Sequence, residues 1–575
     1  MSSEAQGLFY IGKRFGGNKM NKKRILSLLL AFILLITMSV GCSKQTSPID
    51  ANQGTDSKIL KIGISGNTGL FNPVMADNIY DDYVTKTIFE ALVDNNPQGE
   101  MIPVLAKEWK LSEDKLTYTF TLKDGIKFSD DTPLTTEDVA FTYLTIAHPD
   151  YNGPRAYAVS SLAGYDEYHN GTKSTFDGIK IIDEKNISFT FKEGMAAPAN
   201  IECFIYGIMP KHYYKFEKWE DFLALNEKPL GSGVMVFDSW EPKQFIKVVK
   251  NKNYWDKAGG AKIDGILFSE VPDESIISAL KTNQIDFAKV PSAAENLAAL
   301  KSLDNVSVVN YPGNGYSFMC FNCVNPKLSD VRVRQALLYS LDREAFIKAQ
   351  YGEGLASVGM SPISPASWAF PDPSELNDYK FDMEKASKLM EEAGWKMGKD
   401  GFRYKDGEKF HINWLVYTNT TWPGTLSGMA ADTWKQLGVD LEIELMDHQV
   451  VAARTMEAAP DDKDFDIYTM GFSVSIDPDP TGALFDDNAY TAGGYNASGY
   501  KNAYAAELIK KGKTEFDTEK RAVIYKEWAK IMNEEIPHAI IAYISEIWGI
   551  NKRVKGIELG TYSSWVQHLK NITIE

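Results

Sequence analysis

Short apolar runs and longer stretches of helically spaced apolar residues alternate along the whole chain. Residues 59–64 (ILKIGI) form a run that predicts a buried strand. Residues 117–122 (TYTFTL) alternate strictly between threonine and apolar side chains, which predicts a half-buried strand. The Asp124-Gly125 pair that follows is typical of a tight turn, so we expect a hairpin in which residues 126–128 return along that strand.

Helix signals lie between these strand signals. Thr135 stands three residues before Asp138 and predicts a capped helix start. Asp330 and Asp382 likewise precede stretches with helical spacing. In residues 429–447 the helical pattern stops at Gly438, and apolar and acidic residues then alternate, which predicts a helix, a turn and a half-exposed strand. With no internal repeat, these alternating signals indicate an α/β fold.

Composition narrows the class of protein. The 575 residues are 44% hydrophobic, which excludes disorder and predicts two or three lobes. A formal net charge of -16 argues against a nucleic-acid partner, because an acidic surface repels phosphate. Four cysteines do not make a disulfide framework, and no two histidines lie within five positions of each other. We therefore expect no cofactor and no structural metal.

The N-terminal region has the three-part layout of a secretory signal. Basic residues 22–24 precede an apolar run at 25–40, and small residues lead to Cys42. The apolar run is short for a membrane span, and residues 42–57 read as a flexible polar tether. We interpret residues 1–41 as a cleaved signal peptide, with translation starting at Met20.

Ser39-Val40-Gly41-Cys42 resembles a bacterial lipoprotein box, in which the cysteine becomes the lipidated first residue of the mature chain. One departure is Ser39, where such boxes usually carry leucine. The alternative is an ordinary secretory cleavage beside a chance cysteine. The resemblance implies a lipid anchor at Cys42 that holds the protein on the outer face of the bacterial cytoplasmic membrane.

Eight further segments carry recognisable patterns and cover nearly the whole mature chain. They are residues 88–96, 103–143, 231–240, 283–288, 328–344, 389–395, 434–444 and 494–500. In this order the set resembles one family, the extracytoplasmic solute-binding proteins of family 5 that serve peptide and nickel ATP-binding-cassette importers. Within that family it is most similar to a peptide-binding member.

The resemblance implies a two-lobed fold of the periplasmic-binding-protein type (type II, cluster C). The first lobe would be discontinuous, formed by residues 58–98, 229–313 and 543–575, with an inserted subdomain at 99–228. The second lobe would be residues 314–542. Such a protein is a monomer that closes on a peptide without chemical reaction and delivers it to permease subunits driven by cytoplasmic ATPases.

The family's main-chain contact segments also transfer to this sequence. In the first lobe they fall on Asp77, Asn78 and Ile79, and in the second on Gly471, Phe472 and Ser473. Well-studied peptide binders carry an aspartate four positions after that glycine, which pairs with the α-ammonium of the ligand. Here Ser475 stands at that position, so Asp477 is the substitute if the loop is shifted; otherwise the ligand has no free N-terminus.

Aromatic residues between second-lobe elements are candidates for ligand contact. Trp422, Tyr490 and Tyr495 are predicted to lie in loops, with the Asn496 amide beside Tyr495 as a hydrogen-bonding group. Several stacked rings would favour an oligosaccharide instead of a peptide. Free nickel fits less well, because the nearest histidine to these segments is His448, but a chelated nickel ion stays open.

Three other readings are weaker. Residues 477–482 imitate the start of a calcium loop, but position twelve is Asn488 and not glutamate. Cys320 and Cys323 are interpreted as buried free thiols and not as a metal or redox pair. A secreted hydrolase is the competing class, yet no Gly-x-Ser-x-Gly or His-Glu-x-x-His motif supports an enzyme.

Overall fold

The structure is a computed structural model that describes residues 58–479 and 484–575. The predicted signal peptide, the tether and Cys42 lie outside the described residues. Among the described residues, no helix is long and apolar enough to cross a bilayer.

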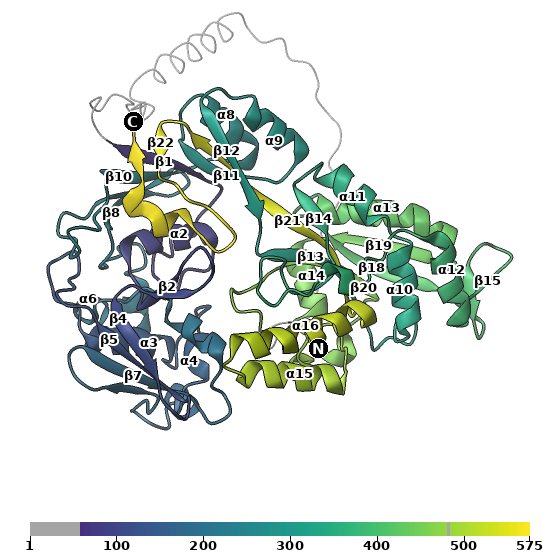
Figure 1. Ribbon diagram of the computed structural model, residues 1–575, viewed down its shortest axis with the longest axis horizontal. Coiled ribbons are helices and arrows are strands. Elements are labelled where there is room, and N and C mark those ends of the chain that lie inside the picture. The colour runs from purple at the N-terminus through teal and green to yellow at the C-terminus, as the bar shows by residue number, and fades with distance from the viewer. Residues whose placement is uncertain (1–57, 480–483) are drawn as a thin grey trace, which may run out of the picture. The chain divides into compact units, whose positions relative to one another are not determined.

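One long strand, β21 (His538–Asn551), joins two halves of a 12-stranded sheet (Figure 1). Residues 538–544 of β21 pair with β13 (Gly315–Phe321) and β14 (Ala356–Val358). Residues 545–551 pair with β12 (Val306–Pro312) and β11 (Phe287–Val290). We call residues 58–312 and 545–575 the first lobe, and residues 313–544 the second lobe.

The chain passes between the lobes a second time directly beside β21. Gly313 N donates to Ile544 O at 2.9 Å. A Cβ atom on Gly313 would lie 2.7 Å from that same oxygen, which is closer than side chains come to backbone. The two segments that connect the lobes therefore lie side by side, in contact at Gly313 and Ile544.

The first lobe is built on strands in the order β8-β9-β10-β1-β11. As predicted, residues 59–64 form a strand, β1, with Leu60 and Ile62 fully buried. The remaining sheet strands are β8 (Met235–Glu241), β9 (Phe245–Lys250) and β10 (Gly265–Glu270). Around them lie α2 (Ile79–Ile88), η2 (Asp273–Ser275), α8 (Ile276–Lys281), α9 (Ala294–Lys301), η6 (Trp565–Asn571) and the small pairs β2 (Val93–Asn95) with β3 (Met101–Pro103) and β22 (Val554–Lys555) with β23 (Thr573–Ile574).

Between β3 and β8 the chain builds a separate antiparallel sheet in the order β4-β5-β7-β6. Residues 117–122 are its strand β5 (Thr117–Leu122), as predicted, but the expected hairpin with residues 126–128 is wrong. Both edges of β5 are already occupied, by β4 (Ala106–Leu111) on one side and β7 (Asn186–Thr190) on the other. After Gly125 the chain instead forms a local turn in which Phe128 N donates to Thr132 O.

The helix predicted at Thr135 is α3 (Thr136–Ile146), and its capping box is present: Thr135 N donates to Asp138 Oδ2 at 2.9 Å. Its buried face carries Val139, Tyr143 and Ile146 against the sheet. The other elements of this subdomain are α4 (Tyr157–Ser160), α5 (Tyr165–His169), β6 (Ile179–Ile181), η1 (Pro198–Phe204), α6 (Lys211–Tyr214) and α7 (Trp219–Leu223).

The second lobe has the strand order β19-β18-β20-β13-β21. The predicted helix, turn and strand are confirmed as α13 (Trp422–Leu437), Gly438 with φ 88°, and β19 (Asp440–Met446). The helical stretch after Asp330 is split into two helices, because Asp342 starts a new one by accepting from Ala345 N at 2.9 Å. The other elements are β18 (His411–Tyr417), β20 (Ile467–Ser473), α10 (Val331–Tyr339), α11 (Arg343–Gln350), η3 (Pro373–Glu375), α12 (Met383–Glu392), β15 (Lys396–Met397), β16 (Arg403–Lys405), β17 (Glu408–Lys409), α14 (His448–Thr455), η4 (Pro460–Asp462), η5 (Asp487–Ala489), α15 (Ala503–Thr514) and α16 (Thr518–Glu535).

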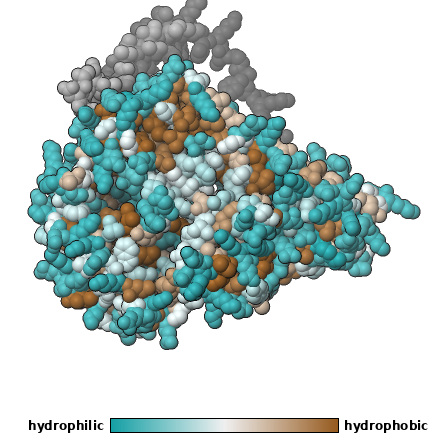
Figure 2. Space-filling view, in the orientation of Figure 1, coloured by the Kyte–Doolittle hydropathy of each residue, from teal (hydrophilic) through white to brown (hydrophobic). Residues whose placement is uncertain are grey.

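Large aromatic side chains fill the interior of both lobes. Trp414 of β18 stacks on Trp434 of α13 at 5.2 Å between ring centroids, and Phe287 of β11 stacks on Trp548 of β21 at 4.7 Å. On the face shown in Figure 2 most residues are hydrophilic, and apolar ones reach the surface in separate patches. Most of the chain's aromatic residues therefore serve packing, as expected for fully buried rings.

Candidate ligand-binding site

The last residues of β20 have an uncovered edge. On one side β20 pairs with β13 over its whole length, from Ile467 opposite Phe321 to Ser473 opposite Gly315. On the other side β18 pairs only with Ile467 and Tyr468. In the described chain no strand continues that pairing beyond Tyr468, so residues 469–473 form a short sheet edge.

The hydrogen-bond phase decides which main-chain groups face that edge. Val474 N donates to Asn314 O at 3.1 Å, and Asn322 N donates to Asp466 O at 2.9 Å. Because antiparallel strands direct the groups of alternate residues toward each other, the even-numbered residues of β20 face β13. Gly471 and Ser473, both exposed, therefore direct their N–H and C=O groups to the uncovered edge. Phe472, between them, packs on Tyr316 with ring centroids 5.9 Å apart.

Asp477, proposed from the sequence as an ammonium partner, is held by an arginine. Its two carboxylate oxygens accept from Arg521 Nη1 at 2.6 Å and Nη2 at 2.8 Å. The Arg521 guanidinium is buried and lies over the rings of Trp368 and Tyr525, at 5.4 and 5.2 Å. A ligand ammonium would have to compete with this bidentate pair, so the anchoring role of Asp477 stays a prediction.

The loop that carries Asp477 also contacts the first lobe. Asp477 N donates to Glu202 Oε1 at 2.7 Å, and Glu202 lies in η1 of the inserted subdomain. Burial raises the pKa of the Glu202 carboxyl to about 7. Sequence reasoning missed Glu202, Arg521 and Trp368, because no local motif marks contacts between distant segments, such as that between Asp477 and Glu202, which are 275 positions apart.

The predicted first-lobe segment lies at the start of α2. Asn78 caps this helix by accepting from the Tyr80 and Asp81 amides at 3.0 Å. Asp77 and Ile79 are exposed beside it. Arg155 fixes the preceding turn by donating to Ala76 O at 2.9 Å. The exposed side chains of this segment are thus presented by a capped, anchored helix start.

Trp422 lies elsewhere than predicted. It is the first residue of α13 and is 7% exposed, so the expectation of a loop is wrong. Its indole Nε1 donates to Tyr417 OH at 2.9 Å. The signal for this was present, because Pro423 directly after it is typical of a first helical turn.

Tyr495 and Asn496 differ sharply in exposure. The Tyr495 side chain is 54% exposed, whereas Asn496 is fully buried. The Asn496 amide donates to Asp486 O at 3.1 Å, and its oxygen accepts from Ser498 Oγ at 2.8 Å and Gly499 N at 3.1 Å. The Asn496 side chain therefore organises its own loop and does not extend beside Tyr495 as expected.

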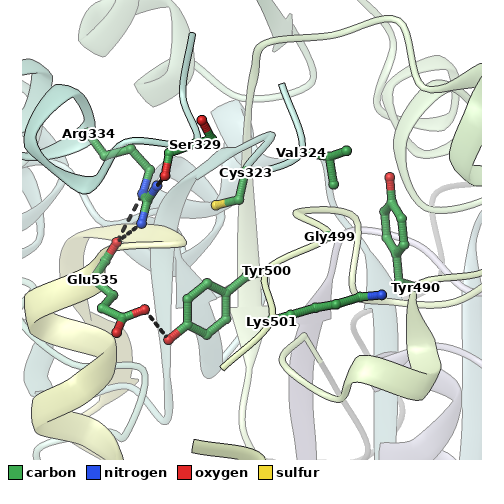
Figure 3. Close-up of a pocket in the computed structure, with 9 residues that line it drawn as sticks. All are labelled: Cys323, Val324, Ser329, Arg334, Tyr490, Gly499, Tyr500, Lys501 and Glu535. Atoms are coloured by element: carbon green, nitrogen blue, oxygen red, sulfur yellow. Dashed lines mark hydrogen bonds between the residues drawn. The ribbon is translucent and has the colours of Figure 1, made fainter. Parts of the chain in front are cut away.

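A cavity of about 480 Å³ lies near this loop, at the end of β13 remote from Ser473 (Figure 3). Figure 3 shows Tyr490 and Lys501 on one side and Arg334 and Glu535 on the other. Arg334 is buried and donates to main-chain carbonyls such as Glu535 O, at 2.9 Å. The Glu535 carboxylate accepts from Tyr500 OH at 2.6 Å. Arg334 and Glu535 thus serve the fold. The cavity is lined by Cys323, Val324, Ser329, Arg334, Tyr490, Gly499, Tyr500, Lys501 and Glu535.

The three cysteines among the described residues, Cys203, Cys320 and Cys323, are free, as expected for Cys320 and Cys323. Burial raises the pKa of the Cys323 thiol to about 11, which makes it a poor nucleophile at neutral pH. Within residues 58–479 and 484–575, no group of three or more histidine, cysteine or acidic side chains is arranged to hold a metal ion. His448 packs its ring against Tyr417 at 5.4 Å. The calcium reading of residues 477–482 falls partly outside the described residues, and Asp477 there already pairs with Arg521.

The chain is similar to known proteins over most of its length. The model of the bacterial extracellular solute-binding proteins, family 5, matches residues 100–493. The oligopeptide-binding protein AppA of Bacillus subtilis is 26% identical over 556 residues, covering 94% of this chain and 96% of its own. The dipeptide-binding protein of Escherichia coli is 27% identical over 493 residues, and the alignment covers 83% of this chain and 86% of that protein.

Solved structures share the fold. AppA of Bacillus subtilis in complex with a nonapeptide superposes with a TM-score of 0.72 at 24% identity, covering 90% of this chain and 98% of its own. NikZ of Campylobacter jejuni, in complex with Ni(L-His), superposes with a TM-score of 0.73 at 23% identity, and the superposition covers 90% of this chain and 99% of NikZ.

The chain belongs to the bacterial extracellular solute-binding proteins of family 5. The resemblance seen in its sequence is thereby confirmed, as are the two-lobed α/β fold and the extracytoplasmic location. Its role is binding and not catalysis.

Proposed function

We propose that this chain captures peptides between its lobes and delivers them to an ATP-binding-cassette importer. The observation that carries the proposal is the uncovered edge of β20, where Gly471 and Ser473 offer main-chain donors and acceptors. An extended peptide satisfies such an edge by adding a strand to the sheet. Relatives named as oligopeptide- and dipeptide-binding proteins support a peptide over other solutes.

Recognition through main-chain groups favours broad side-chain specificity. Gly471 and Ser473 bind amide groups, which every peptide carries, and leave the ligand's side chains unread. On the first lobe, we assign the opposite contacts to the exposed start of α2, Asp77 to Ile79. Of the predicted aromatic residues, the exposed Tyr495 remains a candidate for ligand contact, whereas buried Trp422 supports the fold.

Attachment to the membrane is part of the same proposal. Cys42 would carry the lipid, and residues 43–57 would give the binding domain reach toward the permease. Permease subunits coupled to cytoplasmic ATPases are the expected partners, and the protein would act as a monomer.

Mass spectrometry of ligands that copurify with the full chain tests the proposal. Because a closed binding protein retains solute, we expect peptides of mixed sequence in the eluate. Calorimetry with a pool of random pentapeptides should then show saturable binding. A sugar or a chelated metal in the eluate, with no heat from the peptide pool, would contradict the proposal and support one of the alternatives.

A further inference from the structure

A single carboxyl group bridges the two lobes beside the uncovered edge of β20. Glu202 of η1 belongs to the inserted subdomain, and its Oε1 accepts from Asp477 N, four residues after β20 ends. Nearby, Gly99 of the first lobe lies against Ile476 and Tyr562, where a Cβ atom would be 2.8 Å from the Ile476 side chain. The lobes are therefore in direct contact around Glu202.

Glu202 has no ion-pair partner of its own among the described residues. The nearest cation, Arg521, is committed to both oxygens of Asp477. The other titratable groups that surround Glu202 carry negative charge or none. The groups facing it are Asp477 and Asp479 from the loop, Arg521 from α16, Tyr157 from α4, Cys203 from η1 and Tyr562 from the C-terminal segment.

These surroundings favour the protonated carboxyl. Burial is the largest cause that raises the pKa of Glu202 to about 7, and the charges of Asp477 and Asp479 add to it. The Asp477 N–H and Arg521 act in the opposite direction but are outweighed. A neutral carboxyl still accepts a hydrogen bond through its carbonyl oxygen, so protonation preserves the contact between the lobes.

We propose that closure of the lobes on a ligand takes up a proton at Glu202, so that the protein binds its ligand more tightly in mildly acidic than in alkaline medium. This inference rests on the proposed function, since it assumes that the lobes separate to admit a ligand. When they separate, Glu202 returns to water and to its ordinary pKa near 4.5. The contribution of Glu202 protonation to closure is then fully present below about pH 4.5 and is lost as the pH rises through about 7.

The size of the effect follows from linkage. One proton taken up on closure changes the ligand affinity by at most about tenfold per pH unit inside that window. Above pH 8 the affinity should no longer change with pH through Glu202, because the carboxyl is ionised in both forms. The coupling is reciprocal: protonation of Glu202 raises the affinity for the ligand, and ligand binding raises the affinity of Glu202 for its proton by the same factor.

Calorimetry on the full chain tests the inference. The probe is a pool of random pentapeptides built from uncharged residues, titrated at pH 6 and pH 8 in pairs of buffers with different ionisation enthalpies. For the wild type we expect proton uptake at pH 6 and an affinity about tenfold above that at pH 8. The Glu202→Gln variant keeps the hydrogen-bond acceptor and should show neither proton uptake nor the pH dependence.

The matched control is Glu193→Gln, an exposed glutamate of the same subdomain, which should behave like the wild type. Peptide binding without proton uptake, or uptake that persists in Glu202→Gln, would overturn the inference and leave the proposed function standing. Absence of peptide binding at both pH values would overturn both. Circular dichroism of each variant verifies that the fold is retained.

Discussion

The two ends of the paired strands β13 and β20 differ in how far their polar groups are already hydrogen-bonded within the protein. At the end near Phe321, the Asp466 carboxylate ties neighbouring segments together: it accepts from Lys327 Nζ at 2.9 Å, Asn413 N at 2.8 Å and Asn325 Nδ2 at 2.5 Å. At the end near Gly315, Gly471 and Ser473 have short or absent side chains and β18 has already diverged. The closed end stabilises the lobe, and the open end leaves main-chain donors and acceptors uncovered, where we propose that a ligand binds.

Titratable groups differ between these ends as well. His538 begins β21 at the closed end, stacked on Phe318 at 4.7 Å, and burial lowers the pKa of its imidazole to about 3. It is therefore neutral at any physiological pH. Glu202 at the open end has its pKa raised into the neutral range. A group that titrates near pH 7 thus occurs at a contact between the lobes, whereas a group that stays neutral occurs in the interior of the second lobe.

The largest effect is expected from removing the carboxylate of the closed end. Asp466→Ala leaves the Lys327 ammonium, whose side chain is 27% exposed, without its carboxylate partner and removes the acceptor for a main-chain amide. Breaking such a buried network costs about 4 kcal/mol of unfolding free energy, which urea denaturation measures.

Asp464→Ala is the matched control two residues away. Its carboxylate pairs with Arg454 but is 62% exposed, so its loss should cost less than about 1 kcal/mol. Equal losses for the two variants would mean that the closed end is no more tightly held than the surface.

A smaller effect, on binding rather than stability, should come from the open edge. Ser473→Pro removes an N–H that faces away from β13, and proline is tolerated on such an edge. We expect peptide affinity to fall by about 10- to 100-fold, because the ligand carbonyl loses its donor. Stability should change little, as followed by calorimetry and urea denaturation of the same sample.

Val474→Pro, at the neighbouring position, tests the opposite edge of the same strand segment. Its N–H donates to Asn314 O in the ladder, so this variant should lose stability by about 1 to 3 kcal/mol. If Ser473→Pro lost stability as well and kept full affinity, the assignment of the two edges would be reversed.

Local patterns predicted elements well where the deciding interaction was also local. The strand at residues 59–64, the capped start of α3 and the turn at Gly438 each depend on side chains within a few positions. The hairpin after β5 failed because β7, more than sixty residues further on, occupies the edge that the returning strand needed. A two-residue turn signal carries no information about that competition.

The candidate site was predicted only in part for the same reason. The β20 segment was identified by resemblance, but its phase, which places Gly471 and Ser473 at the uncovered edge, depends on the register with β13. Asn496 and Trp422 carry side chains suited to ligand contact, and both are buried. Glu202 belongs to another lobe, and only the folded chain brings it to Asp477.

The central claim is that a ligand binds through its main chain along the edge formed by Gly471 and Ser473. A series of synthetic peptides, each N-methylated at one residue of a copurified sequence, tests it most directly by calorimetry. Only alternate amides of an added strand face β20, so the largest losses of affinity should fall at two positions that are two residues apart, with the amide between them tolerant. Uniform tolerance of N-methylation, or equal loss at every position, would contradict the account.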